Sequence, residues 1–107
     1  MKLYFLSTCY ACPEQYDVYR ENGEICSYVR LRWGNLIVEY PDVSGEIIYH
    51  ECFEDNFKGM FDDDIERQKY LSEISNVISN KVCGKEVNTE YEIFTDIDDL
   101  RKRLNNE

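Results

Sequence analysis

Residues 15–33 read QYDVYRENGEICSYVRLRW, and this stretch decides the fold. Two segments of strand composition, 15–21 and 24–33, flank Asn22-Gly23. Asn-Gly is the pair best suited to a two-residue type I′ turn, because both turn positions need a positive φ. Such a turn also sets the pairing register of a hairpin. The predicted register places Arg20 opposite Ile25, Val18 opposite Ser27 and Tyr16 opposite Val29, so that one apolar face collects Tyr16, Val18, Ile25, Val29, Leu31 and Trp33.

Further strands are predicted on both sides of this hairpin. Gly34-Asn35 is a second turn pair and leads into Leu36–Tyr40, where pairing would set Trp33 against Leu36 and Leu31 against Val38. The next predicted strand is Glu46–Cys52, in which alternation puts Ile47 and Tyr49 on one side and Ile48 and His50 on the other. A short apolar run at Lys2–Ser7 predicts a strand before the hairpin.

An antiparallel sheet with one apolar face needs a cover, and the segment 62–80 is predicted to supply it as a helix. Asp63 can cap this helix with Glu66 three residues later, and apolar residues follow at helical spacing. Residues 90–95 alternate like a last strand, and 96–104 is typical of a short helix with acids first and bases last. The predicted fold class is therefore α+β: residues 1–107 form one domain, an antiparallel β-meander of four to five strands covered by one main helix, with a short C-terminal strand and helix.

The charge of the chain restricts its partners. Among 107 residues, 22 are acidic and 12 are Lys or Arg, which gives a formal charge of −10. This field disfavours direct binding to nucleic acid or to an anionic membrane and favours a basic protein surface. Without a predicted leader or membrane-spanning run, we expect a cytoplasmic protein.

The chain has five cysteines, an odd number that predicts reduced thiols rather than a disulfide framework. Cys9 and Cys12 form a CxxC motif, but the helix that would lower a thiol pKa is not predicted after it. Zinc binding is the other interpretation of the motif, with Cys9, Cys12, His50 and Cys52 as four possible ligands. We expect no metal and no cofactor, with buried cysteine acting as a small apolar residue.

The segment 51–66 interleaves carboxylates with aromatic residues. Such a surface suits a basic partner, because charge speeds encounter and aromatic side chains anchor the complex. The alternative is that the aromatic residues close the core while the acids solvate and cap the helix. The predicted partner-binding residues are Glu54, Asp55, Phe57, Phe61, Asp62, Asp63 and Asp64.

The polar face of the predicted sheet offers a second candidate site. Tyr19, Tyr28, Arg30 and Arg32 could hold a nucleotide-like ligand. The alternative is a solvated face on which Arg30 pairs with Glu39 across neighbouring strands. No phosphate-binding glycine loop, nucleophile elbow or Ser-His-Asp order is present, so we expect a binding protein and not an enzyme.

Several short motifs carry a resemblance to a known group of proteins. They are CPEQYDV at 12–18, YVRLRWG at 28–34 and YPD at 40–42, followed by Gly45-Glu46 and Ile48-Tyr49. In these motifs the first half of the chain resembles small uncharacterised proteins of Firmicutes bacteria and their phages. The resemblance implies an accessory protein of a phage or mobile element, one that would bind and inhibit a host defence protein in the host cytoplasm.

Overall fold

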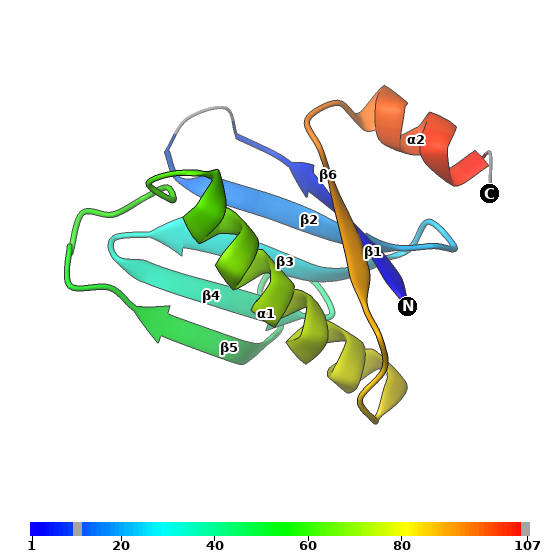
Figure 1. The fold of residues 1–107 in the computed structure, drawn as a ribbon, viewed down its shortest axis with the longest axis horizontal. Coiled ribbons are helices and arrows are strands. Elements are labelled where there is room, and N and C mark those ends of the chain that lie inside the picture. Colours follow the sequence, from blue (N-terminus) through cyan, green and yellow to red (C-terminus); the bar gives the residue numbers. More distant parts are fainter. Residues whose placement is uncertain (10–11, 106–107) are drawn as a thin grey trace.

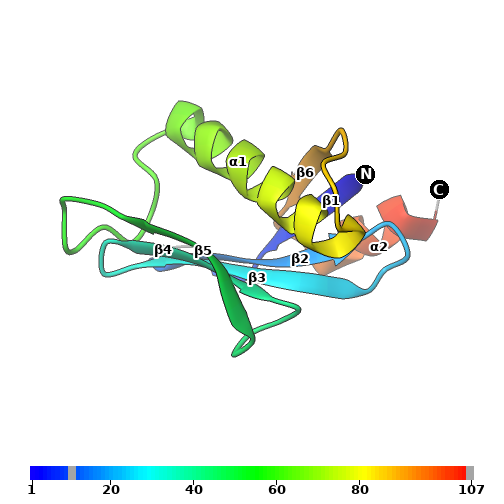
Figure 2. The same ribbon diagram turned by 90° about the horizontal axis from the view of Figure 1, so that it is seen from below.

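A computed structural model describes residues 1–9 and 12–105 and shows an α+β fold with six strands in one sheet. The strand order is β5-β4-β3-β2-β1-β6; β1 to β5 are antiparallel neighbours, and β6 runs parallel to β1. Helix α1 crosses one face of the sheet (Figures 1 and 2). In chain order the elements are β1 (Lys2–Ser7), β2 (Glu14–Arg20), β3 (Ile25–Arg32), β4 (Asn35–Tyr40), β5 (Glu46–Cys52), α1 (Asp64–Cys83), β6 (Glu90–Phe94) and α2 (Ile97–Asn105).

The β2–β3 hairpin is confirmed, but its turn differs from the predicted type. Only Gly23 has a positive φ (86°) in this loop, and its N–H donates to the Arg20 carbonyl over 3.0 Å. A β-bulge follows, so that Tyr19, not Arg20, lies opposite Ile25. The bulge brings Cys26 into the core in place of Ile25, which stays exposed. The predicted pairs Val18–Ser27 and Tyr16–Val29 are confirmed.

The β3–β4 turn is Trp33-Gly34 instead of the predicted Gly34-Asn35. Both residues have positive φ values, 53° and 72°, as a type I′ turn requires. The register moves with the turn: Leu31 lies opposite Leu36, and Arg30 lies opposite Ile37. The predicted Arg30–Glu39 cross-strand pair is therefore wrong, and Tyr28 lies opposite Glu39. Trp33 leaves the predicted apolar face and is 59% exposed.

Strand β5 has the predicted bounds but a different distribution of side chains. A second irregularity lies between Val38 and Glu39 on β4, which pair with Tyr49 and Ile47. Ile48 and Tyr49 both pack against the core under α1, whereas Ile47 is exposed. Strict alternation fails here because the bulge inserts one unpaired residue.

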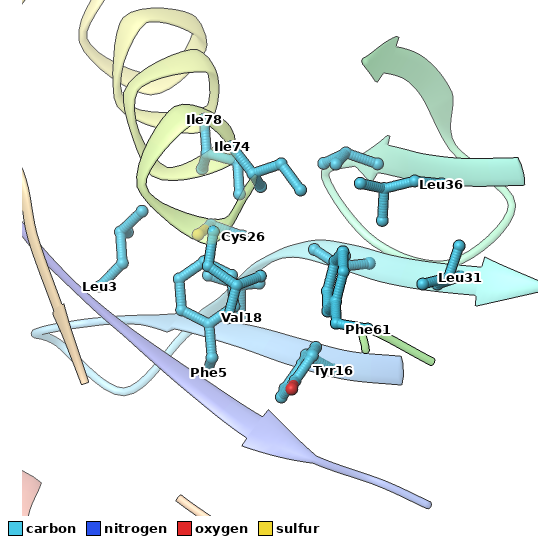
Figure 3. Packing of buried hydrophobic residues seen from close by; sticks show 13 residues of the cluster. Leu3, Phe5, Tyr16, Val18, Cys26, Leu31, Leu36, Phe61, Ile74 and Ile78 are labelled. Atoms are coloured by element: carbon cyan, nitrogen blue, oxygen red, sulfur yellow. The ribbon is translucent and has the colours of Figure 1, made fainter. Parts of the chain in front are cut away.

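Helix α1 begins two residues after the predicted start. The Asp63 carboxylate accepts the Glu66 N–H over 2.8 Å, which confirms the predicted cap, and Gly84 ends the helix with φ 73°. Figure 3 shows Ile74 and Ile78 of α1 over Phe5 and Val18 of the sheet. Burial of each such side chain contributes roughly 1.5–3 kcal/mol. The buried apolar residues of this core are Leu3, Phe5, Tyr16, Val18, Cys26, Val29, Leu31, Leu36, Val38, Phe61, Leu71, Ile74 and Ile78.

Strand β1 is buried on both faces, which explains its continuous apolar run. Leu3 and Phe5 pack under α1, whereas Tyr4 and Leu6 contact Leu100 of α2 on the opposite side. Packing on this second face of β1 holds α2 beside β1 and β6 (Figure 1). No helix within residues 1–9 and 12–105 is long and apolar enough to cross a bilayer.

Gly34 and Gly84 give a matched test of the β3–β4 turn. An added Cβ at Gly34 would lie 2.6 Å from the Asp55 carbonyl oxygen, whereas at Gly84 it would meet nothing within 4 Å. Gly84→Ala, with almost the same φ, should lower the free energy of unfolding by about 1–2 kcal/mol. Gly34→Ala should cost roughly 1–3 kcal/mol more, because overpacking against backbone adds to the same dihedral strain. Urea unfolding measures both changes, and equal losses would contradict the close approach.

Candidate functional site

Two aromatic side chains are displayed at the turn end of the sheet. Trp33 is 59% exposed and Phe57 is 78% exposed, yet their rings meet edge to face with centroids 6.2 Å apart. The exposed acids Glu54 and Asp55 come just before Phe57 in the chain. We call Trp33, Phe57, Glu54 and Asp55 the aromatic–acidic patch.

Backbone hydrogen bonds at Gly34 hold this patch together. The Phe53 N–H donates to the Gly34 carbonyl over 2.7 Å, and the Gly34 N–H donates to the Lys58 carbonyl over 2.8 Å. Within the loop, the Phe57 N–H donates to Asp55 Oδ1 over 2.9 Å. The β3–β4 turn and the segment 53–58 therefore form one unit. An L residue with positive φ carries strain, and at Trp33 that strain accompanies an exposed indole ring.

The three consecutive aspartates of the predicted surface have roles within the fold. Asp62 pairs with Lys58 over 2.8 Å, Asp63 caps α1, and Asp64 pairs with Arg67. Lys58 also pairs with Glu66 over 2.9 Å; burial alone would lower its pKa, but the bonds to Asp62 and Glu66 raise it above its usual value. These carboxylates are less free for a partner than Glu54 and Asp55.

Phe61 is not part of any exposed surface. Its side chain is 2% exposed, stacks on Tyr70 with centroids 5.6 Å apart and belongs to the main core. The alternative interpretation, closure of the core, therefore holds for Phe61 and corrects its assignment to the partner-binding set. Phe57 and Met60 remain exposed.

A buried carboxylate, Glu14, ties the segment before α1 to the sheet. Arg67 donates to it through Nε over 2.7 Å and Nη2 over 3.2 Å, and the Tyr16 hydroxyl and the Phe61 N–H (3.1 Å) complete its partners. Its own N–H donates to the Gly59 carbonyl over 2.6 Å. Burial by itself raises the pKa of Glu14, but the hydrogen bonds from Arg67, Tyr16 and Phe61 hold it below its usual value.

Glu14 is not among the site residues predicted from the sequence. The sequence signal is only an acidic residue between Pro13 and an apolar alternation, and its role becomes clear only from its distant partner Arg67. The cleft beside this network has a volume of about 260 Å³ and is lined by Ser7, Cys9, Glu14, Tyr16, Met60, Asp64, Arg67, Ile93 and Thr95.

The four residues of the nucleotide-like alternative do not all come together. Tyr28, Arg30 and Arg32 share the sheet face opposite α1, at alternate positions of β3. Tyr19 lies on the same face, opposite Tyr4 of β1, but it packs against the small cluster under α2, away from the two arginines. Burial raises the pKa of Tyr28, while the charge of Arg30 opposes that shift. The Tyr28 hydroxyl donates to Gln15 Oε1 over 3.0 Å.

The CxxC and zinc alternatives gain no support from the geometry. Strand β2 starts at Glu14, and all five thiols are free. His50 Nε2 lies 2.9 Å from Asn35 Oδ1 on the sheet face, and Cys52 is exposed at the end of β5. Within the part of the chain that the structure describes, no three His, Cys, Asp or Glu residues are placed to hold a metal ion.

The chain matches no protein-family model, no curated protein and no solved structure.

Replacing Glu14 tests the buried network. Glu14→Gln should lower the free energy of unfolding at neutral pH by about 2–3 kcal/mol, since it leaves Arg67 without its buried partner. Because the folded-state pKa of Glu14 is lowered, its stabilisation is present above pH 4.5, the ordinary value, and is lost as pH falls through the folded-state pKa. The variant should therefore lose less stability than the wild type as pH falls from neutral into that range.

Urea unfolding across this pH range measures both effects, with Glu24→Gln in the exposed β2–β3 loop as the control. An identical pH dependence in the wild type and Glu14→Gln would show that Glu14 is not the group responsible.

Proposed function

We propose that this protein is a non-catalytic binding protein that attaches to a basic surface of another protein through the aromatic–acidic patch. The observation that carries the proposal is the pair Trp33 and Phe57, two large rings in contact with each other and mostly exposed to solvent. Aromatic residues are the most frequent anchors at protein interfaces. Rings that are already fixed also lose little entropy on binding.

The construction of the patch supports this proposal. A Trp at positive φ is strained, and strained residues cluster at functional sites. The hydrogen bonds at Gly34 hold the strained turn against the segment that carries Phe57. The fold thus maintains an exposed ring pair that contributes little to its own core.

The charge of the chain supports a basic partner. Glu54 and Asp55 are exposed beside the rings, and the net charge of −10 speeds encounter with a positive surface. Occupation of that surface would block whatever else binds there, so the expected effect is inhibition. A host defence protein is the partner implied by the phage resemblance of the first half, and it stays a prediction.

The two aromatic anchors are tested by capturing the partner by affinity and then measuring the Kd of the purified partner for each variant. Trp33→Ala and Phe57→Ala should each weaken binding roughly 30-fold, the effect of losing a 2 kcal/mol anchor. Val43→Ala and Ile65→Ala are matched controls, since these apolar side chains are 56% and 80% exposed elsewhere, and they should change affinity less than about threefold. Wild-type affinity in both ring variants, or equal losses in the controls, would overturn the proposal.

The contribution of charge to the association rate is tested separately with the double variant Glu54→Gln/Asp55→Asn. The amides keep the acceptor oxygen that Asp55 offers to the Phe57 N–H, so the loop should stay intact. Association should become slower and less dependent on salt, because exposed charges act mainly through a field that salt screens. An unchanged salt dependence of the association rate would show that these carboxylates do not face the partner.

A further inference from the structure

The sheet face opposite α1 carries two arginines without carboxylate partners. Arg30 and Arg32 make no ion pair with any carboxylate in residues 1–9 and 12–105, although acids far outnumber bases in this chain. By contrast, Arg67 and Arg103 each bind a glutamate. Figure 2 shows α1 on one side of β4 and β5 and no helix over their other side.

Arg30 has an unfulfilled hydrogen-bonding group. Its Nε is buried and has no hydrogen-bond partner. A buried donor without a partner is destabilising and rare in folded proteins, so such a group calls for an explanation. Arg32 is exposed, and its guanidinium lies 6.0 Å from the centroid of the Trp33 ring.

The neighbours of these arginines on the same face are polar or apolar but not acidic. Arg30 lies between Gln15 and Ile37, followed by His50 on β5, and Arg32 lies opposite Asn35. The nearest acids on this face, Asp17 and Glu39, lie in the row of Tyr28, one row from Arg30 and two rows from Arg32. Two residues along a strand span roughly 6.6 Å, so Arg32 is about 13 Å along the strand from that row, beyond the screening length of about 8 Å at physiological salt.

We propose that this face binds a nucleoside monophosphate, with the phosphate held by Arg30 and Arg32 and the base stacked on the exposed ring of Trp33. Arginine presents a planar fork of donors that matches phosphate oxygens. An exposed tryptophan stacks with any nucleobase. This ligand site goes beyond the protein-binding function proposed above, although Trp33 belongs both to it and to the aromatic–acidic patch.

The acidic residues near the β3–β4 turn lower the affinity of this site for a phosphate, and their removal offers a specific test of it. Glu54 and Asp55 lie on the loop that packs against Gly34, next to Trp33 in the fold. Their charges repel a phosphate and attract a basic protein. Removing them should therefore change the two binding events in opposite directions.

Trp33 is the single tryptophan of the chain, so its fluorescence reports directly on the site. Titration with AMP should quench this fluorescence, and calorimetry should give a lower Kd for AMP than for adenosine or inorganic phosphate alone. Arg32→Ala should raise the Kd for AMP at least about tenfold. Arg30→Lys, which keeps the charge but not the fork, should raise it several-fold. Arg101→Ala, which removes an exposed charge on α2, is the matched control and should leave the Kd within about twofold.

Three results of these titrations would overturn the inference. They are no AMP binding at millimolar concentration, binding that Arg32→Ala leaves unchanged, and equal affinity for AMP and inorganic phosphate or for AMP and adenosine. Two further variants separate this inference from the proposed function. Phe57→Ala should weaken partner binding roughly 30-fold and leave AMP binding intact, and Glu54→Gln/Asp55→Asn should tighten AMP binding about twofold or more while it weakens the protein complex. Weakening of both events by the second variant would also overturn the inference, because the phosphate would then not lie near Arg32.

Discussion

The buried carboxylate of Glu14 is the constraint on which the turn end of the molecule depends. Its side chain binds Arg67 of α1 and the Phe61 N–H, and its backbone binds the Gly59 carbonyl. Strand β2, the segment before α1 and α1 itself thus meet at one residue. A buried charge that is fully hydrogen-bonded tolerates few other arrangements, because any partner lost leaves an uncompensated charge. These hydrogen bonds hold Phe61 in the core. They also restrain the end of the β5–α1 connection that lies next to α1.

That restraint has a consequence for Trp33 and Phe57. The segment 53–58 is bounded by Gly34 on one side and by the contacts of Glu14 on the other. Phe57 lies between these two attachments and points its ring outward, against Trp33. The exposed rings are therefore not the end of a loose loop. Pre-organised aromatic side chains of this kind make efficient anchors, since a partner need not order them.

The sequence predicts the local elements well and their irregularities poorly. Asn22-Gly23 and the alternation around it identify the hairpin, and Asp63 with Glu66 identifies the start of α1. The bulge that exchanges Ile25 for Cys26 has no signal in the local pattern, because both residues are apolar and either can be buried. The turn at Trp33-Gly34 also escapes prediction, since a Trp at positive φ is disfavoured without its tertiary contacts.

Long-range partners explain the remaining differences. The parallel pairing of β6 with β1 and the packing of α2 on Tyr4 join segments almost a whole chain apart. The segment 51–66 shows the same limit in the candidate site: spacing identifies it as aromatic and acidic, but only burial separates Phe61 in the core from Phe57 at the surface. The shared face of Arg30 and Arg32 follows from strand alternation, whereas their lack of carboxylate partners depends on the register of β4.

Hydroxyl-radical footprinting of the protein, free and in complex with the proposed basic partner, shows whether Trp33 and Phe57 lie at the interface. We expect Trp33 and Phe57 to be oxidised readily in the free protein and protected in the complex. Ile47, which is 57% exposed on β5, should be oxidised equally in both states. Protection of Ile47 with Trp33 and Phe57 still fully reactive would show that the partner lies on another surface and not on the aromatic–acidic patch.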